Sequence, residues 1–273
     1  MKRLLITLPQ LADRDNLLLA TWKAARGRQQ RPVVARFLAT LDQRLDNLAA
    51  SIMAQTAPQG RMRRFTIFDP KQREITAACF ADRVLHHALL NLAEPRFEAA
   101  LVPSSFACRP GLGVHAAVAA LQRQLQRWPW WVQVDVAGYF PSIDHGLLMA
   151  MLARRFKGAD HLALWQRIIA SGVPEGRGAA VGLPIGALTS QHLANAYLDA
   201  ADRFLLGVCP QRLRCSRPGR IGNAPTMRCM PRWRIPTAWA CASGCGRASP
   251  ACWTPSTTNR RGLVKVPARC PST

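Results

Sequence analysis

Acidic residues are missing from the last part of this sequence. From Gly207 to Thr273 it contains no aspartate or glutamate and only two leucines, but it holds twelve basic residues, nine of the 20 prolines and seven of the nine cysteines. Such a composition offers no apolar period from which a helix or strand can form, and its prolines interrupt any that begins. We therefore expect residues 207–273 to form a disordered basic tail, unlike the sequence before it.

Long apolar runs and zinc-type cysteine pairs are also lacking. Pro9, Asp13 and Asp15 interrupt the N-terminal leucines, which excludes a signal-peptide core there, and no later run is long enough to cross a bilayer. Cys241 and Cys245 are four residues apart, with no Cys-x-x-Cys or nearby histidine to complete a zinc tetrad. The sequence predicts a soluble, cytoplasmic protein with no membrane association.

Positive charge, by contrast, is abundant. The net charge is +22 at pH 7 and the isoelectric point is near 11.3. The imbalance is not confined to the tail, because residues 1–206 hold 25 basic and 15 acidic residues. A charge of this size predicts a polyanionic partner, in the first place a nucleic acid, with a membrane surface as the lesser option.

Hydrophobic periodicity predicts a mixed α and β chain in three parts. Residues 1–60 should be helical, with one apolar stripe from Phe37 to Leu48. Residues 61–206 should begin with a short strand around Phe65 and Ile67 and continue with alternating helices and loops. The expected helices of that part are 76–92 (stopped by Pro95), 114–128, 143–156 (capped by Ser142, with Asp144 at its positive end), 161–170 and 187–206.

One carboxylate stands out within the stretch "WVQVDVAGYFPSIDH". Asp135 ends the most strand-like run of the chain, and an aromatic pair and a proline follow it. A strand-end acid beside a backbone carbonyl, here that of Val136, suits metal-assisted phosphoryl transfer, because the strand fixes the acid rigidly. Taken alone, Asp135 could equally be an ordinary turn acid at the end of a strand.

Three other stretches accompany it in a fixed order. "FDPKQREI" places Lys71 and Arg73 on an expected loop, and "SSFACRPGLG" carries Arg109. Further on, "GLPIGALTSQHLANAYL" has glycines at 182 and 186, which allow a backbone to approach a ligand closely. Together with the Asp135 stretch, these blocks resemble the fingers and palm of a bacterial reverse transcriptase, of the group II intron and diversity-generating retroelement type, over roughly residues 61–206.

The resemblance implies a right-hand polymerase fold with fingers and an incomplete palm, and an RNA-directed DNA polymerase reaction that uses Mg²⁺, an RNA template, a DNA primer and deoxynucleoside triphosphates. A retroelement RNA is a further possible partner. Asp135 and Val136 would hold the metal, and Phe140 would be the gate that excludes a 2′-hydroxyl. The residues implied in nucleotide or template binding are Lys71, Arg73, Arg109, Val136, Phe140, Gly182, Pro184, Gly186 and Gln191.

Each of these roles has a plainer alternative. Lys71 and Arg73 could be solvated loop charges, and Arg109 could be a turn residue beside its proline. Gln191, with Asn195 on the same helix, could order the helix start, and Phe140 could belong to the core. The tryptophans at 128, 130 and 131 could pack the strand or stack on bases.

The second half of a two-metal site is absent from the sequence. Such a site needs carboxylates from two strands that hold metals about 3.5–4 Å apart, and in the family these come from a Tyr-x-Asp-Asp hairpin after the long helix. The last acidic residue here is Asp202. Asp144, Asp199 and Asp202 lie on expected helices, as a helix-end charge and as solvent-facing partners of arginine. The expected thumb is missing as well, so the chain as written should be inactive.

Two explanations of the tail remain open. Its arginine, proline, cysteine and tryptophan content is typical of translation in the wrong frame after a slip near Gly207, which would also account for the missing hairpin. The alternative is a genuine basic tail that binds RNA through phosphate contacts, in a nucleic-acid-binding protein without catalysis.

Overall fold

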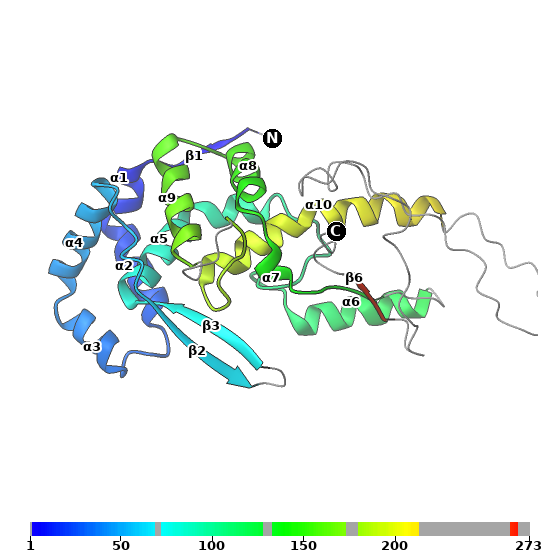
Figure 1. The fold of residues 1–273 in the computed structure, drawn as a ribbon, viewed down its shortest axis with the longest axis horizontal. Coiled ribbons are helices and arrows are strands. Elements are labelled where there is room, and N and C mark those ends of the chain that lie inside the picture. The colour runs from blue at the N-terminus through cyan, green and yellow to red at the C-terminus, as the bar shows by residue number, and fades with distance from the viewer. Residues whose placement is uncertain (1, 69–71, 128–132, 173–179, 213–262, 267–273) are drawn as a thin grey trace, which may run out of the picture. The chain divides into compact units, whose positions relative to one another are not determined.

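The structure, a computed structural model, describes residues 2–68, 72–127, 133–172, 180–212 and 263–266 (Figure 1). The chain divides into two compact units. The first comprises Met1–Pro129 and Gly138–Asp199, and the second comprises Trp130–Ala137 and Ala200–Thr273. Helices dominate and the strands are short, which confirms the mixed α and β prediction in its coarse form. None of the helices in these ranges combines the length and apolarity needed to cross a bilayer.

The N-terminal segment is helical, as predicted. Thr7 begins the first helix with a reciprocal capping box to Gln10, and Asp13 caps the second through the amide of Asn16. The predicted stripe from Phe37 to Leu48 is divided at Thr40 between two helices, although its buried residues Phe37, Leu45 and Leu48 still belong to one core cluster. The four helices are α1 (Leu8–Ala12), α2 (Arg14–Ala25), α3 (Pro32–Ala39) and α4 (Leu41–Met53).

An antiparallel hairpin follows these helices. Strand β2 (Met62–Phe68) pairs with β3 (Gln72–Ala78) in a register that sets Ile67 opposite Arg73. The predicted strand is therefore confirmed, but the prediction that Arg73 lies on a loop is wrong. Pairing with β2 extends the hairpin to residues that the sequence pattern had assigned to a loop. Lys71 lies outside the described residues.

Helix α5 (Phe80–Glu98) differs from its prediction at both ends. Thr76 pairs with Arg64 in the hairpin and so belongs to β3, which delays the helix start to Phe80. Pro95 does not stop the helix. It costs the helix one backbone hydrogen bond, while the face that carries Ala93 and Phe97 stays buried and keeps the last turn in place.

Among the described residues, the rest of the first unit consists of helices and loops together with the short strand β5 (Phe156–Lys157), which pairs in parallel with β1 (Leu4–Leu5). Ser142 does not cap the helix after it, since its hydroxyl bonds the Tyr139 carbonyl, and Asp144 caps that helix by accepting from the Leu147 amide. The helices are α6 (Val114–Arg127), α7 (Tyr139–Ser142), α8 (His145–Arg155), α9 (Ala159–Ser171) and α10 (Leu188–Arg212), the last of which continues into the second unit.

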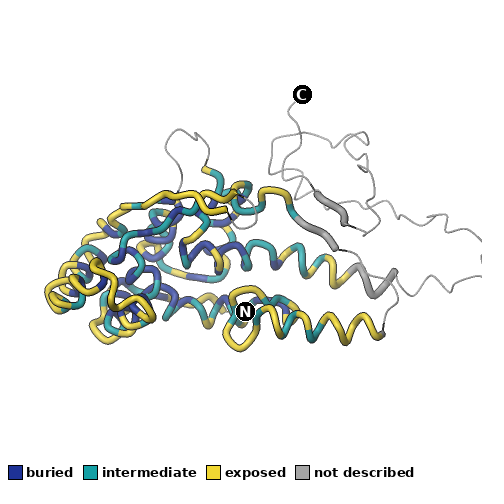
Figure 2. The backbone as a smooth tube through the Cα atoms, turned by 90° about the horizontal axis from the view of Figure 1, so that it is seen from below, coloured by how far each residue is buried: buried dark blue, intermediate teal, exposed yellow. Residues whose placement is uncertain are grey.

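One core runs through the first unit. Phe97 packs edge-on against Phe156 and Trp165, with ring centroids 5.3 and 6.0 Å away, and the buried cluster extends from Ile6 to Ala196 (Figure 2). The N-terminal helices contribute to the same cluster as residues beyond 61, and α2 packs along α5. The boundary expected at residue 60 stays a prediction.

The second unit contains β4 (Gln133–Val136) and β6 (Leu263–Val266). These strands pair in parallel, with Asp135 opposite Lys265. A short strand thus lies within the segment for which the sequence offered no period, and α10 runs past Leu206 to Arg212. The tail between 212 and 263, and the tryptophans at 128, 130 and 131, lie outside the described residues.

Candidate nucleic-acid interface

The glycine turn at 182–186 is fastened to the segment that follows the Asp135 strand. The Gly182 amide donates to the Ile143 carbonyl at 2.7 Å, and the Leu183 amide donates to the Phe140 carbonyl at 2.9 Å. His145 adds two bonds, from its amide to the Ala180 carbonyl at 2.9 Å and between its Nε2 and the Gly182 carbonyl at 2.6 Å. Two of the predicted blocks are therefore joined into one structural feature, although Phe140 and Ile185 are 45 residues apart in the chain.

The same turn touches the hairpin. The Thr76 amide donates to the Ile185 carbonyl at 2.7 Å, so β3 binds the turn directly. Gly186 has φ +111°, and a Cβ there would lie 2.7 Å from Ile75 Cγ2 and 3.2 Å from the Thr76 carbonyl oxygen. Glycine is required at this position both by conformation and by close approach. Hence the turn joins three of the four sequence blocks within the first unit.

Phe140 and Pro184 belong to the two segments that these hydrogen bonds join. Phe140 is half-buried against the core and meets Tyr139 edge-on, with ring centroids 5.8 Å apart. The Tyr139 hydroxyl donates to the Ala194 carbonyl at 2.6 Å, which anchors the segment on α10. Pro184 lies against Gly172, where an added Cβ would come within 2.3 Å of the proline ring. Both residues are positioned by packing, and their contacts with a nucleotide stay predictions.

The hairpin presents arginines beside exposed apolar side chains. Pairing puts Arg63, Phe65 and Ile67 on one face with Ile75 and Arg73 opposite. Phe65 and Ile67 are exposed on this face, while Phe68, 76% exposed at the end of β2, lies on the other face together with Arg64. Guanidinium groups bind phosphates and exposed rings stack on bases, so this surface has the composition of a single-strand nucleic-acid contact.

Sequence reasoning missed a second surface of this kind. Trp22 is 60% exposed on α2, and the Arg26 guanidinium lies 5.7 Å from its ring centroid. Arg28 and Arg31 follow in the loop, and the pKa of Arg83 is lowered by burial and then by the charges of these two arginines. The signal was present in the sequence as "TWKAARGRQQR", a tryptophan ahead of a basic run without acids.

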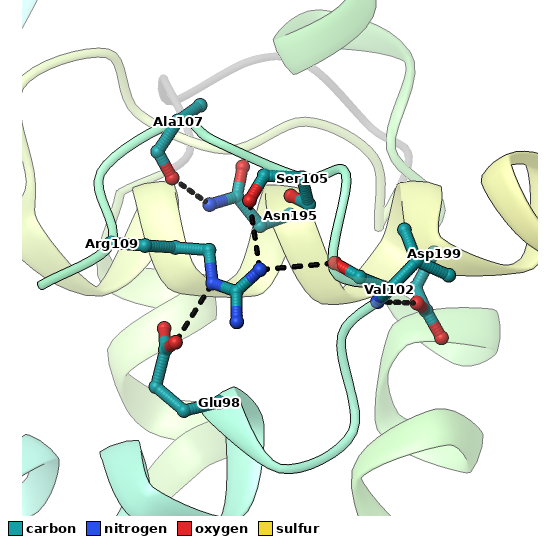
Figure 3. Close-up of polar contacts among 7 residues, drawn as sticks. All are labelled: Glu98, Val102, Ser105, Ala107, Arg109, Asn195 and Asp199. Carbon is teal, nitrogen blue, oxygen red and sulfur yellow. Dashed lines mark hydrogen bonds and ion pairs between the residues drawn. The ribbon is translucent and has the colours of Figure 1, made fainter. Parts of the chain in front are cut away.

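Arg109 lies in the loop between α5 and α6 and points inward (Figure 3). Its Nε donates to Glu98 Oε2 at 2.8 Å, and its Nη1 donates to the Val102 and Ser105 carbonyls at 3.0 and 2.8 Å. The Arg109 side chain is 11% exposed. Every one of these bonds is internal to the loop or to its junction with α5.

Helix α10 holds the same loop from the other side. Asn195 Nδ2 donates to the Ala107 carbonyl at 2.6 Å, and Asp199 Oδ1 accepts from the Val102 amide at 3.1 Å (Figure 3). Asp199 also lies 3.8 Å from Arg155. The prediction of an arginine partner is confirmed, but the prediction that Asp199 faces solvent is wrong, because helix packing covers it. Gln191, at the start of α10, is exposed.

Asp135 belongs to the second unit and is the third residue of β4, with Val136 as the last. A carboxylate and a backbone carbonyl are the oxygen donors that Mg²⁺ takes, so the residue types at this strand end fit part of a magnesium coordination set. Within the part of the chain that the structure describes, no three histidine, cysteine, aspartate or glutamate residues gather into a group that could hold a metal.

No family model matches the chain. It is 32% identical to Protein YkfC of Escherichia coli K12 over 143 residues, which cover 50% of this chain and 38% of that protein. It is 27% identical to the group II intron-encoded protein LtrA of Lactococcus lactis subsp. cremoris over 139 residues, which cover 50% of this chain and 23% of LtrA. Further relatives are also named for introns.

A solved structure, a partial Cas6-RT-Cas1–Cas2 complex, matches with a TM-score of 0.44 and 19% identity over 73% of this chain and 35% of that chain. The chain spans well under half the length of the two curated relatives, YkfC and LtrA.

Proposed function

We propose that the chain is a reverse transcriptase of the group II intron-encoded type and that it binds RNA with the fingers and first part of a polymerase palm. The reaction of the family is template-directed addition of deoxynucleotides to a primer 3′-hydroxyl. The observation that carries the proposal is the glycine turn, which is hydrogen-bonded both to the Phe140 segment and to β3. A rigid junction of this kind can hold a template and a nucleotide in one register.

The proposed roles follow the order of the blocks. Lys71 and Arg73 face the charge of a triphosphate, and Phe140 lies beside the sugar, where a bulky ring excludes a 2′-hydroxyl. The turn from Gly182 through Pro184 to Gly186 supports the new base pair, with Gln191 on the helix behind it. Basic side chains and backbone amides serve these roles because they offset phosphate charge.

Asp135 and Val136 would hold Mg²⁺, which would supply charge stabilisation for the attacking oxygen and the triphosphate when bound. The protein's own contribution is the strand end, at which Asp135 and Val136 are consecutive residues. We propose that the chain as written extends primers poorly or not at all, since the sequence has no acidic residue after Asp202 to complete a two-carboxylate set.

A primer-extension assay tests this directly. Purified protein, an RNA template with an annealed DNA primer, Mg²⁺ and deoxynucleotides should give no more extension than an Asp135→Ala variant. Extension well above that variant would show that one strand acid suffices, and would overturn the proposed inactivity while leaving the family assignment intact.

A second candidate function is RNA binding without any catalysis. Two exposed basic and aromatic surfaces favour it, one on the β2–β3 hairpin and one around Trp22 and Arg26. The two candidates share RNA affinity and differ in nucleotide binding. Protection of the Gly182–Gly186 turn by a deoxynucleoside triphosphate and Mg²⁺ favours the polymerase function, and RNA binding without it favours the second.

A further inference from the structure

The loop between α5 and α6 is largely exposed, yet hydrogen bonds hold it at several points. Pro103, Ser104, Ala107 and Cys108 are exposed, yet the Val102 amide, three carbonyls and the Arg109 side chain are all engaged. Cys108 has φ +54°, which costs a residue with a side chain some free energy. An exposed loop that is pinned this firmly keeps one backbone shape before any ligand arrives.

Arg109 is poorly placed to contact a phosphate. Its guanidinium has five N–H donors in a fixed fork, and the Nε and Nη1 groups are directed at Glu98, Val102 and Ser105 (Figure 3). With the side chain 11% exposed, a phosphate contact would require these bonds to break and the Glu98 carboxylate to lose its partner. The Arg109 guanidinium therefore bonds groups of its own loop and of the end of α5.

Asn195 and Asp199 grip the two sides of the same loop from a single helix. They are four residues apart, so they lie on one face of α10, one turn from each other. Asp199 fixes the Val102 amide where the loop begins, and Asn195 fixes the Ala107 carbonyl beside the left-handed Cys108. About two turns before Asn195, α10 begins at Leu188, directly after the glycine turn, so one helix follows the turn and also holds the loop.

We propose that Arg109, Asn195 and Asp199 form a brace that presents the 102–110 loop to bound RNA, and that Arg109 is a positioning residue that does not touch the RNA itself. This inference rests on the proposed RNA binding. It replaces the phosphate contact implied for Arg109 by the resemblance with an indirect role, and it gives Asn195 and Asp199 a role that the sequence did not suggest.

Lysine at position 109 separates the two roles. A phosphate contact needs a positive charge, which lysine keeps, whereas the brace needs a planar fork, which lysine lacks. If Arg109 is a brace, Arg109→Lys and Arg109→Gln weaken binding of a short single-stranded RNA to the same extent, by about five- to tenfold, the lower end of the range for energetic coupling between sites. If Arg109 touches phosphate, Arg109→Lys binds almost as the wild type, while Arg109→Gln lowers the slope of log affinity against log salt by about one. That second outcome overturns the brace.

Asn195→Asp provides an isosteric second variant. It keeps the size of the side chain but removes the donor that reaches the Ala107 carbonyl, so it should reproduce the affinity loss of Arg109→Lys, and the double variant should lose less than the product of the two effects. Gln122→Glu on the exposed surface of α6 is the matched control, because it adds one negative charge away from the loop. An equal loss in the control would mean that charge alone explains Asn195→Asp, which overturns the brace.

Amide hydrogen exchange in the free protein tests the brace in the absence of RNA. The Ser105 and Leu112 amides, which donate to the Val102 and Arg109 carbonyls, should exchange faster in Arg109→Lys and Asn195→Asp but not in Asp199→Asn, which keeps an oxygen acceptor for the Val102 amide. Unchanged exchange in the first two variants overturns the brace. A wild-type chain that binds no RNA overturns the proposed function and the RNA part of this inference, while exchange still decides whether the loop is braced.

Discussion

At the scale of single residues, burial decides which polar groups act as structure. His86 is 1% exposed, and neither of its ring nitrogens has a partner within the described part of the chain. Burial, followed by the charges of the neighbouring His87 and Arg83, lowers its pKa to about 4. His161 is equally buried, accepts a hydrogen bond from the Trp165 indole, and also has a pKa lowered to about 4 by burial. Both histidines are therefore neutral in the folded protein near pH 7.

These histidines predict acid sensitivity. Each gains a proton more readily in the unfolded chain than in the fold, so the free energy of unfolding is highest above pH 6.5 and falls as the pH drops from 6.5 to about 4. A full shift of this kind is worth up to about 3 kcal/mol per group. Urea midpoints measured at pH 7.5 and 5 should differ less in His86→Leu than in the wild type.

His115→Leu is the control, because it makes the same substitution at an exposed position on α6. Comparison of differences removes the common contribution of carboxylates, which titrate in the lower part of the same range. If His86→Leu and the wild type lose stability in parallel, His86 does not contribute to the acid sensitivity.

At the scale of elements, the glycine turn is the junction on which the proposed function depends. Gly186→Ala places a methyl group 2.7 Å from Ile75 Cγ2 at a φ of +111°, so the turn or β3 has to shift. We expect a loss of about 1–3 kcal/mol in the free energy of unfolding and weaker RNA binding, because the strain adds to the clash. Chemical denaturation and an RNA titration measure the two effects.

Gly207→Ala is the matched substitution for this prediction. An added Cβ at Gly207 has nothing within 4 Å, and the residue lies in α10, where alanine is favoured over glycine by about 1 kcal/mol. It should be neutral or slightly stabilising. Equal stability losses in the two variants would mean that the close approach at Gly186 is not the cause.

The sequence predicted an element well where helical periodicity determines it, and poorly where pairing with a distant strand determines it. The 3.6-residue period placed α6, α9 and the start of α10 closely, because each of these helices is long, although α10 continues beyond its predicted end to Arg212. Thr76 was assigned to a helix because a three-residue strand end has no period of its own, and its pairing with Arg64 depends on a strand twelve residues away. Pro95 was overestimated as a helix stop, since buried neighbours outweigh one lost hydrogen bond.

At the scale of the whole molecule, the tail distinguishes the two explanations of this chain. Removal of residues 213–273 leaves α10 intact to Arg212 and deletes most of the acid-free segment. If the tail is translated out of frame, as we expect, RNA affinity and its salt dependence should barely change. If it is an RNA-binding module, the slope of log affinity against log salt should fall by about 0.7 for each single-strand phosphate contact that is lost.

Circular dichroism of the truncated chain checks that the helices persist, since deletion also removes the β6 partner of β4. A gene sequence that encodes a Tyr-x-Asp-Asp hairpin in another frame beyond codon 206 would support the out-of-frame explanation independently. A marked loss of RNA affinity with an unchanged spectrum would instead favour the genuine basic tail.

The sequence by itself determined the charge, the order of the four blocks and the helical period, because these depend only on residue type and spacing. These features carry the resemblance to reverse transcriptases of the group II intron type. Only the tertiary structure decided that Arg109 turns inward, that Asp199 is covered, and that the glycine turn bonds to both Phe140 and β3. The reason is physical: hydrogen bonds between residues far apart in the chain depend on which faces pack together, and local sequence carries no record of that choice.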